Sequence, residues 1–302
     1  MAFRPGGPRD LPLLGERLEA LRRDWSSRRL DSDPLAFAHH FTDADDREVV
    51  AFLAASLAFG RVASIRASVA RVLEAMGPNP ATFLEKWGEK PIPSLKHFVH
   101  RWVSGKDVED FLRMVKRARR ARGSLGALFA AGDEEEEKTS GADYVSALSH
   151  LHRNLLSFSS SSTTSRGLKF LLPVPESGSA CKRSHLFLRW MIRTEGFDLG
   201  LWTGGRFTPA RLLLPMDTHV HRIARYLGLT RRPVADLAAA REATGWLRRL
   251  NPGDPVAYDW ALSRLGILAE CTTARTRRHC ERCAVRPVCR ASLVPSTGAA
   301  AA

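Results

Sequence analysis

Apolar residues recur at three- and four-residue spacing along most of the chain, which is the pattern of helices that bury one face. Runs of alternating β-branched residues, which would predict strands, are nearly absent. We therefore expect an all-α protein. The expected helices cover residues 11–25, 48–59, 63–76, 106–121, 144–155, 183–193 and 234–250.

Polar residues punctuate this helical pattern. Asp45 and Asp46 precede the second expected helix, and Ser64 lies near the start of the third. The segment 132–141 carries an acidic run, and the segment 157–165 is almost wholly Ser and Thr. We expect both segments to be solvated, mobile surface loops, and residues 291–302 to form a disordered tail.

The chain is strongly basic. Its 302 residues include 46 Lys and Arg against 32 Asp and Glu, a formal net charge of +14. This excess favours a polyanionic partner, although a codon bias towards Arg and Ala would also produce it. The basic run 116–122 is consistent with phosphate binding, but a solvated helix face explains such a run more often.

A membrane location is not indicated. The longest apolar run, residues 49–59, is too short to span a bilayer. The N-terminus has no apolar stretch of signal-peptide length, so we expect a cytoplasmic protein without membrane association, whose charge favours DNA or RNA as the partner.

Four of the five cysteines are clustered near the C-terminus with the spacing C-x8-C-x2-C-x5-C. Four thiolates in so short a segment are a usual ligand set for one iron–sulfur cluster or one zinc ion. Four-cysteine zinc sites usually contain two C-x2-C pairs, and this segment contains one, so iron–sulfur is favoured over zinc. Arginines alternate with the ligands and would form a phosphate-binding surface. The four ligands are Cys271, Cys280, Cys283 and Cys289.

A second informative segment is LLLPMDTHVHRIARYLGL, residues 212–229. Asp217 directly precedes an amphipathic helix that Gly228 ends, so its carboxylate is placed to cap the first turn. Capping alone explains an aspartate here. A carboxylate held beside a ligand cavity could also orient water or stabilise a developing positive charge. His219 and His221 should point to different faces and not share one metal ion.

This segment resembles part of a known enzyme family. The strings MDTHVHRIARYLGL and DPVAYDWALSRLGILAEC, followed by the cysteine quartet, are similar to the endonuclease III-type DNA glycosylases of the helix-hairpin-helix/Gly-Pro-Asp superfamily. The last two cysteine spacings match those of the family, and the first is two residues longer. The resemblance is strong from about residue 210 to 290, and residues 45–59 look like the family's early core helix.

The resemblance implies a two-subdomain helical fold that ends in a metal-cluster loop. One subdomain would be a helical barrel of residues 36–210 with the two inserted loops, and the other would combine residues 1–35 with 211–290. The resemblance also implies that Asp217 is the catalytic aspartate and that the four cysteines hold a [4Fe–4S] cluster.

The chain departs from the family in the hairpin before the aspartate. Family members carry a glycine-rich hairpin whose backbone approaches a DNA phosphate, with a nucleophilic lysine in the bifunctional enzymes. The closest counterpart here is PESGSACKRSHLFL, which places Lys182 at the lysine position, 35 positions before Asp217. That separation resembles the remodelled hairpin of archaeal 8-oxoguanine glycosylases. The chain is also similar to a bacterial family of this superfamily that has no assigned substrate. The implied DNA contacts are Gly178, Ala180, Arg183, His219, Arg277 and Arg278.

These features predict a DNA glycosylase that acts on a damaged or abnormal base, with or without abasic-site lyase activity. The alternatives are a non-catalytic DNA- or RNA-binding iron–sulfur protein on the same scaffold and a redox sensor. Trp202, Tyr258 and Trp260 are candidates for stacking on a flipped base, although isolated aromatic residues more often belong to the core. Cys181 could tune Lys182, but a small buried thiol is the commoner role.

Overall fold

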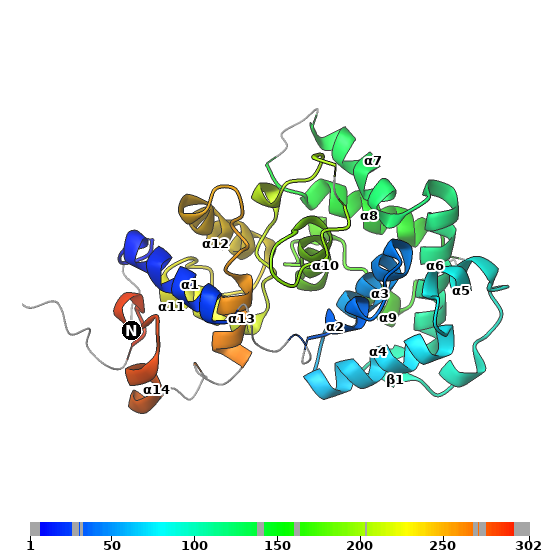
Figure 1. Cartoon of the computed structure of the whole chain (residues 1–302), viewed down its shortest axis with the longest axis horizontal. Coiled ribbons are helices and arrows are strands. Elements are labelled where there is room, and N and C mark those ends of the chain that lie inside the picture. Colours follow the sequence, from blue (N-terminus) through cyan, green and yellow to red (C-terminus); the bar gives the residue numbers. More distant parts are fainter. Residues whose placement is uncertain are drawn as a thin grey trace, which may run out of the picture. The chain divides into compact units, whose positions relative to one another are not determined.

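The computed structural model describes residues 7–25, 30, 33–137, 142–159, 164–202, 204–267, 271 and 276–292. The chain divides into two compact units, one of residues 1–28 and 208–302 and the other of residues 29–207. The subdomains expected from the sequence, 36–210 and 1–35 with 211–290, have boundaries close to those of these units. The described residues are mostly helical, which confirms the all-α expectation (Figure 1).

The unit that contains both chain ends is formed by helices alone among its described residues. α1 packs against α12 and α13, and α11 packs against α13. Leu18, Ile223 and Leu262 are almost fully buried between them. Its elements are α1 (Leu11–Trp25), η4 (Pro209–Arg211), α11 (Thr218–Leu227), α12 (Leu237–Leu250), α13 (Asp259–Ile267), α14 (Arg277–Arg282) and η5 (Arg286–Val288).

The unit of residues 29–207 is built around the pairing of α3 with α10 (Figure 1). Its only sheet among the described residues is the antiparallel hairpin β1–β2. Its elements are α2 (Ala36–His39), α3 (Ala44–Ser56), α4 (Val62–Met76), α5 (Pro80–Lys86), η2 (Pro93–Leu95), β1 (Val99–His100), β2 (Val103–Ser104), α6 (Gly105–Arg122), α7 (Leu125–Glu137), α8 (Val145–Ser157), α9 (Arg166–Leu171), η3 (Pro175–Ser177) and α10 (Lys182–Ile192).

All seven expected helices are present, and a capping residue explains where two of them start. α3 begins four residues earlier than expected because Asp43 is its cap and accepts hydrogen bonds from the backbone N–H groups of Asp45 and Asp46. α12 begins later than expected because Asp236 caps it. At α3 and α12 a side-chain acceptor therefore fixes where the helix starts, whereas α4, α8 and α10 begin without a side-chain cap.

One expected loop is wrong. The whole acidic run, residues 133–137, lies on α7, which continues to Glu137, and Asp133 is completely buried. Residues 138–141 lie outside the described residues. In the second expected loop, Ser157 ends α8 and Ser165 caps α9, while residues 160–163 lie outside the description. Of the expected tail, only Ala291 and Ser292 are described.

A buried carboxylate joins the elements of the unit 29–207. Glu48 of α3 is 4% exposed and accepts hydrogen bonds from four donors. The donors are the Arg119 guanidinium at 3.1 Å, the Leu125 and Gly126 backbone N–H groups at 3.0 Å, and the Trp202 indole N–H at 2.8 Å. Glu48 therefore satisfies the free N–H groups of the first turn of α7 with an acceptor from a distant helix.

Gly126 makes the approach of Trp202 possible. A Cβ atom at this position would lie 2.7 Å from the Trp202 indole nitrogen. The indole then packs on Phe129 at a ring-centroid distance of 5.2 Å and meets Phe187 edge-on at 5.3 Å. The hydrogen bond to Glu48 and the aromatic packing consequently support each other.

The sequence predicts no membrane-spanning segment. In the part of the chain that the structure describes, no helix combines the length and the apolar character needed to cross a membrane.

We predict that Glu48→Gln lowers the free energy of unfolding of the unit by about 3 kcal/mol, because it removes one partner of a buried ion pair and turns an amide N–H₂ towards other donors. Urea unfolding followed by circular dichroism measures this change. The control is Glu74→Gln on the exposed side of α4, which should change stability by less than about 0.5 kcal/mol. Equal effects of the two substitutions would contradict the role of Glu48.

Candidate functional site

The carboxylate of Asp217 is held at the start of α11. Its Oδ1 atom accepts hydrogen bonds from the backbone N–H groups of His219 at 2.8 Å and Val220 at 2.9 Å. The preceding segment is buried, and the Leu214 N–H donates to the Thr244 hydroxyl on α12 at 2.9 Å. The expected capping role of Asp217 is confirmed, and its half-exposed side chain lies at the positive end of the helix dipole.

The two histidines that follow have different surroundings. His219 is exposed and its Cβ atom lies against Gly266 of α13, where an added Cβ would be only 2.8 Å away. His221 is buried, and its Nε2 atom lies 3.0 Å from the Arg232 carbonyl oxygen. They therefore take separate contacts, as the spacing predicts.

The same helix α11 anchors both ends of the cysteine segment. The Arg222 guanidinium donates to the carbonyl oxygen of Cys271 at 2.7 Å, and the Arg290 N–H donates to the Tyr226 carbonyl oxygen at 2.7 Å. Sequence reasoning missed both anchors, because nothing in the local pattern distinguishes Arg222 from the other surface arginines. α11 thus links the capped carboxylate to the cysteines within one unit.

A left-handed glycine at the end of α11 makes room for this attachment. Gly228 has φ +78°, and a Cβ atom there would lie 2.6 Å from the Arg290 Nε atom. The Arg290 guanidinium continues to the carbonyl oxygen of Gly7. Burial lowers the pKa of Arg290 from its usual value, and arginine remains charged at neutral pH even so.

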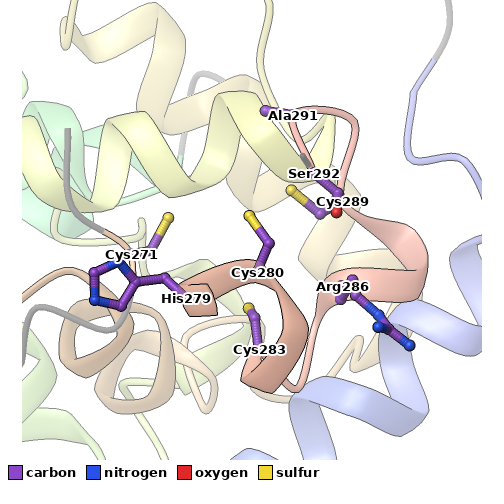
Figure 2. Close-up of a pocket in the computed structure, with 8 residues that line it drawn as sticks. All are labelled: Cys271, His279, Cys280, Cys283, Arg286, Cys289, Ala291 and Ser292. Atoms are coloured by element: carbon purple, nitrogen blue, oxygen red, sulfur yellow. The ribbon is translucent and has the colours of Figure 1, made fainter. Parts of the chain in front are cut away.

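The four cysteines line one small hollow that is partly open to solvent (Figure 2). Cys271 follows α13, Cys280 lies on α14, Cys283 ends α14 and Cys289 ends η5. Tight turns hold the last three together, with the Cys283 N–H donating to the Cys280 carbonyl oxygen and the Arg286 N–H donating to that of Cys283. His279 and Arg286 complete much of the wall (Figure 2).

The donor set fits a thiolate-bound metal centre. Four thiols line the hollow, the donors of both four-cysteine iron–sulfur and zinc sites, and His279 adds an imidazole to the same lining. Over the described residues, no three His, Cys, Asp or Glu side chains are closed around a common metal position. The residues are therefore gathered as a set without being in ligating geometry.

Lys182 belongs to the other unit, 29–207, whereas Asp217 belongs to the unit of both chain ends. Lys182 is the first residue of α10 and is half-buried. The turn before it contains Gly178, which is exposed and has φ +84°. No atom lies within 4 Å of the position that a Cβ atom on Gly178 would take. This open glycine leaves the backbone accessible, whereas Ala180 is buried with 6% exposure.

The predicted DNA contact at Arg183 is wrong in this arrangement of the chain. Its guanidinium is buried and donates to the carbonyl oxygens of Ser56 at 2.6 Å and of Phe170. It also lies over the rings of Phe59 and Phe170, 4.9 and 4.2 Å from their centroids. Burial lowers the pKa of Arg183 to about 10. Arg183 therefore ties α10 to α3 and α9, and the buried Ala180 is no phosphate contact either.

A comparison with known protein families places this chain. The family described as "Protein of unknown function (DUF2400)" matches residues 33–268. The chain belongs to the DUF2400 family. No curated protein and no solved structure matches it. In this DUF2400 protein the matched region includes Lys182 and Asp217 and ends before Cys271.

Other candidates of this DUF2400 protein divide into internal and exposed residues. Trp202 is buried and donates to Glu48, so of its two possible roles it takes the commoner one, in the core. Tyr258 is buried too, and burial raises its pKa. Trp260 is half-buried beneath the Arg264 guanidinium. Cys181 is buried and its thiol has a raised pKa because of that burial, as a structural cysteine would.

The basic residues also divide into internal and exposed ones. In the run 116–122, Lys116 and Arg119 are buried, and Arg117 is bound to Glu89 and the Phe158 carbonyl oxygen. This run is therefore largely a packed helix face. Arg277 and Arg278 of α14 are exposed, beside the cysteine hollow.

We predict that Asp217→Ala lowers the free energy of unfolding by about 1 kcal/mol, because the first turn of α11 loses its cap. Asp217→Asn should change it by much less, since the amide oxygen can accept the same two hydrogen bonds. Thermal unfolding of both variants measures the difference. Equal losses in the two variants would show that the negative charge, and not the cap, stabilises the helix.

Proposed function

We propose that this DUF2400 protein is a DNA glycosylase of the base-excision type, with Asp217 as the catalytic carboxylate. The observation that supports it most is α11, which holds the half-exposed carboxylate at its start and anchors the cysteine segment along its length. The resemblance of the sequence around Asp217 to the helix-hairpin-helix/Gly-Pro-Asp glycosylases supports the same reaction.

The proposed reaction uses the charge of Asp217. The target nucleotide leaves the base stack and enters a pocket, and the bond between the base and C1′ lengthens. The sugar then gains positive charge, which a fixed carboxylate stabilises more in the transition state than in the ground state. The backbone N–H groups of His219 and Val220 donate to Oδ1 of Asp217 and so keep its carboxylate in place during the reaction.

Lys182 is the proposed nucleophile of an associated lyase activity. Its unprotonated amine would form a bond to C1′ as the bond to the base breaks, and the base would leave with the electron pair and take up a proton. The attacking amine would lose its extra proton, and the C1′–O4′ bond would then break with a proton going to O4′, which opens the sugar and leaves a Schiff base. Loss of a proton from C2′ and departure of the 3′ phosphate would cleave the strand. The position of Lys182 at the start of α10, after the exposed Gly178, supports contact with a DNA backbone.

We propose that Cys271, Cys280, Cys283 and Cys289 hold a [4Fe–4S] cluster. Such a cluster would supply a rigid cross-link without an open position for substrate. The chain's own part is to present Arg277 and Arg278 on α14 next to these ligands, where their exposed side chains can contact phosphates.

One observation favours a second function, a non-catalytic DNA- or RNA-binding iron–sulfur protein on this scaffold. Of the hairpin residues that the resemblance assigns to DNA, Ala180 and Arg183 are internal. A hairpin with fewer phosphate contacts could bind nucleic acid through its remaining basic surface without reacting. The two functions differ in base release and agree in the salt dependence of binding.

We predict that Asp217→Asn keeps duplex binding while base release falls by at least ~100-fold, because the charge that stabilises the sugar is lost and the helix cap is retained. Single-turnover base release on duplexes with uracil, 8-oxoguanine or other modified bases measures this. Asp236→Asn is the control, since Asp236 also caps a helix of this unit, α12, by accepting from the Ala239 backbone N–H. Unchanged base release in Asp217→Asn would remove the proposed catalytic role, and no release by the unaltered protein on a broad panel would favour the binding protein.

We predict a covalent adduct between the protein and abasic-site DNA on reduction with borohydride, and its loss in Lys182→Gln. Lys90→Gln, which alters an exposed lysine of the same unit, should leave the adduct unchanged. Denaturing gels measure the adduct. An adduct that persists in Lys182→Gln would assign the amine to another residue.

We predict that the purified protein contains about four iron ions per chain and that Cys283→Ser loses them, because each thiolate of the quartet is a ligand. Cys181→Ser should keep the iron, since Cys181 is a buried thiol of the other unit. Elemental analysis and the visible absorption spectrum measure the content. A colourless unaltered protein with one zinc ion per chain would overturn the iron assignment.

A further inference from the structure

The hairpin β1–β2 exposes an aromatic ring that the proposed reaction does not use. Its strands pair Val99 with Ser104 and His100 with Val103, which leaves Arg101 and Trp102 at the turn. Trp102 is 41% exposed. Large exposed apolar side chains are few among the described residues, and Val62, Val99 and Trp102 all lie on this hairpin or on the adjacent α4.

A packed layer of rings supports Trp102 from below. Its ring stacks on Phe59 at 5.8 Å between centroids and 29° between planes, and it meets Phe170 edge-on at 4.7 Å. Phe59 in turn rests against His100 at 4.4 Å. The exposed part of the indole is therefore held in one orientation, so that a ligand ring can stack on it at little cost in conformational entropy.

His100 is itself locked in place. Its Nε2 atom lies 3.0 Å from the Phe59 carbonyl oxygen, which can only accept, so Nε2 carries the hydrogen. Its Nδ1 atom then accepts from the Ser68 hydroxyl at 2.9 Å. Burial lowers the pKa of His100, which keeps it neutral in this layer.

Arg101 occupies a backbone conformation that favours glycine. Its φ is +56°, at the first central position of a two-residue hairpin turn, where type II′ turns prefer glycine. A larger residue in the left-handed region stores backbone strain, which is found most often at functional sites. Its exposed guanidinium carbon lies 5.1 Å from the centre of the Trp102 ring. The turn thus holds a cation beside the ring at the expense of local backbone strain.

Further exposed cations are close in sequence to the aromatic layer. Arg61 begins α4 directly after Gly60, whose added Cβ would lie 3.5 Å from the Arg101 side chain. Lys169 is the neighbour of Phe170 on α9, which packs against β2. A flat ring among cations from three segments matches a ligand made of aromatic bases and phosphates.

We propose that the β1–β2 hairpin is a stacking platform for an unstacked nucleobase, with Trp102 as the stacking ring and Arg101 as the phosphate contact. The bases of a regular duplex hide their faces from each other, so the preferred ligand is single-stranded or has a base displaced from the stack. The proposal rests on the proposed function for the kind of partner, nucleic acid, and not for the reaction.

Fluorescence anisotropy with a labelled oligothymidylate single strand and with a regular duplex tests this proposal on the full chain. Trp102→Leu keeps an apolar side chain against Phe59 but removes the flat ring, and should weaken single-strand binding by at least ~10-fold. Trp102→Phe should restore much of the affinity. Val234→Ala, an exposed apolar residue of the other unit, is the control and should change nothing.

Arg101→Gly tests the cation separately from folding. Glycine relieves the strain at φ +56°, so Tm should stay the same or rise while single-strand affinity falls and its dependence on the logarithm of salt concentration becomes shallower by about one unit. This variant decides the question if Trp102→Leu does not fold.

The proposal is overturned if folded Trp102→Leu binds the single strand as tightly as the unaltered chain, if Arg101→Gly has no effect, or if the unaltered chain does not bind the single strand. Base release from modified duplexes is measured in parallel. Loss of single-strand binding in Trp102→Leu without any base release by the unaltered chain would support the platform and remove the glycosylase. Base release by the unaltered chain, together with single-strand binding that does not depend on Trp102, would support the glycosylase and remove the platform.

Discussion

The buried carboxylate of Glu48 is the interaction on which the unit 29–207 depends. An isolated charge in such a position would be strongly unfavourable, so all of its donors must be in place. They come from α6, from the first turn of α7 and from Trp202, which lies 154 positions away in the sequence. This one group therefore couples the α6–α7 turn, α3 and the aromatic core into a single cooperative arrangement.

The other unit depends on α11 in a comparable way. The helix begins at a carboxylate cap, ends at a left-handed glycine, and uses Arg222 and the Tyr226 carbonyl oxygen to attach the two ends of the cysteine segment. The cysteine segment is thereby attached at both ends to the helix that carries Asp217. A metal centre in this hollow would act on the proposed site by stabilising α11 and not by touching the substrate.

The excess positive charge serves two purposes in this protein. Arg183, Arg119 and Lys116 are internal and hold carbonyl oxygens and carboxylates. Exposed cations remain on α14 and around the β1–β2 hairpin. Net charge alone therefore says little about where a polyanion would bind, because an arginine that is fully engaged inside the protein has no hydrogen-bonding capacity left for a phosphate.

The sequence by itself determined what depends on neighbouring residues. Helix periodicity predicted seven helices, the cap at Asp217 followed from its place before an apolar stripe, and the spacing of the cysteines predicted one shared site. Tertiary structure alone decided what depends on distant partners. Asp133, expected in a loop, is buried, and the indole of Trp202 is bound to Glu48. Arg183 is engaged by Ser56 of another helix, and Arg101 adopts a strained turn that local preferences oppose. Burial and hydrogen bonding between remote segments outweigh local preference at these positions, because each buried polar group must find its partner wherever the fold supplies one.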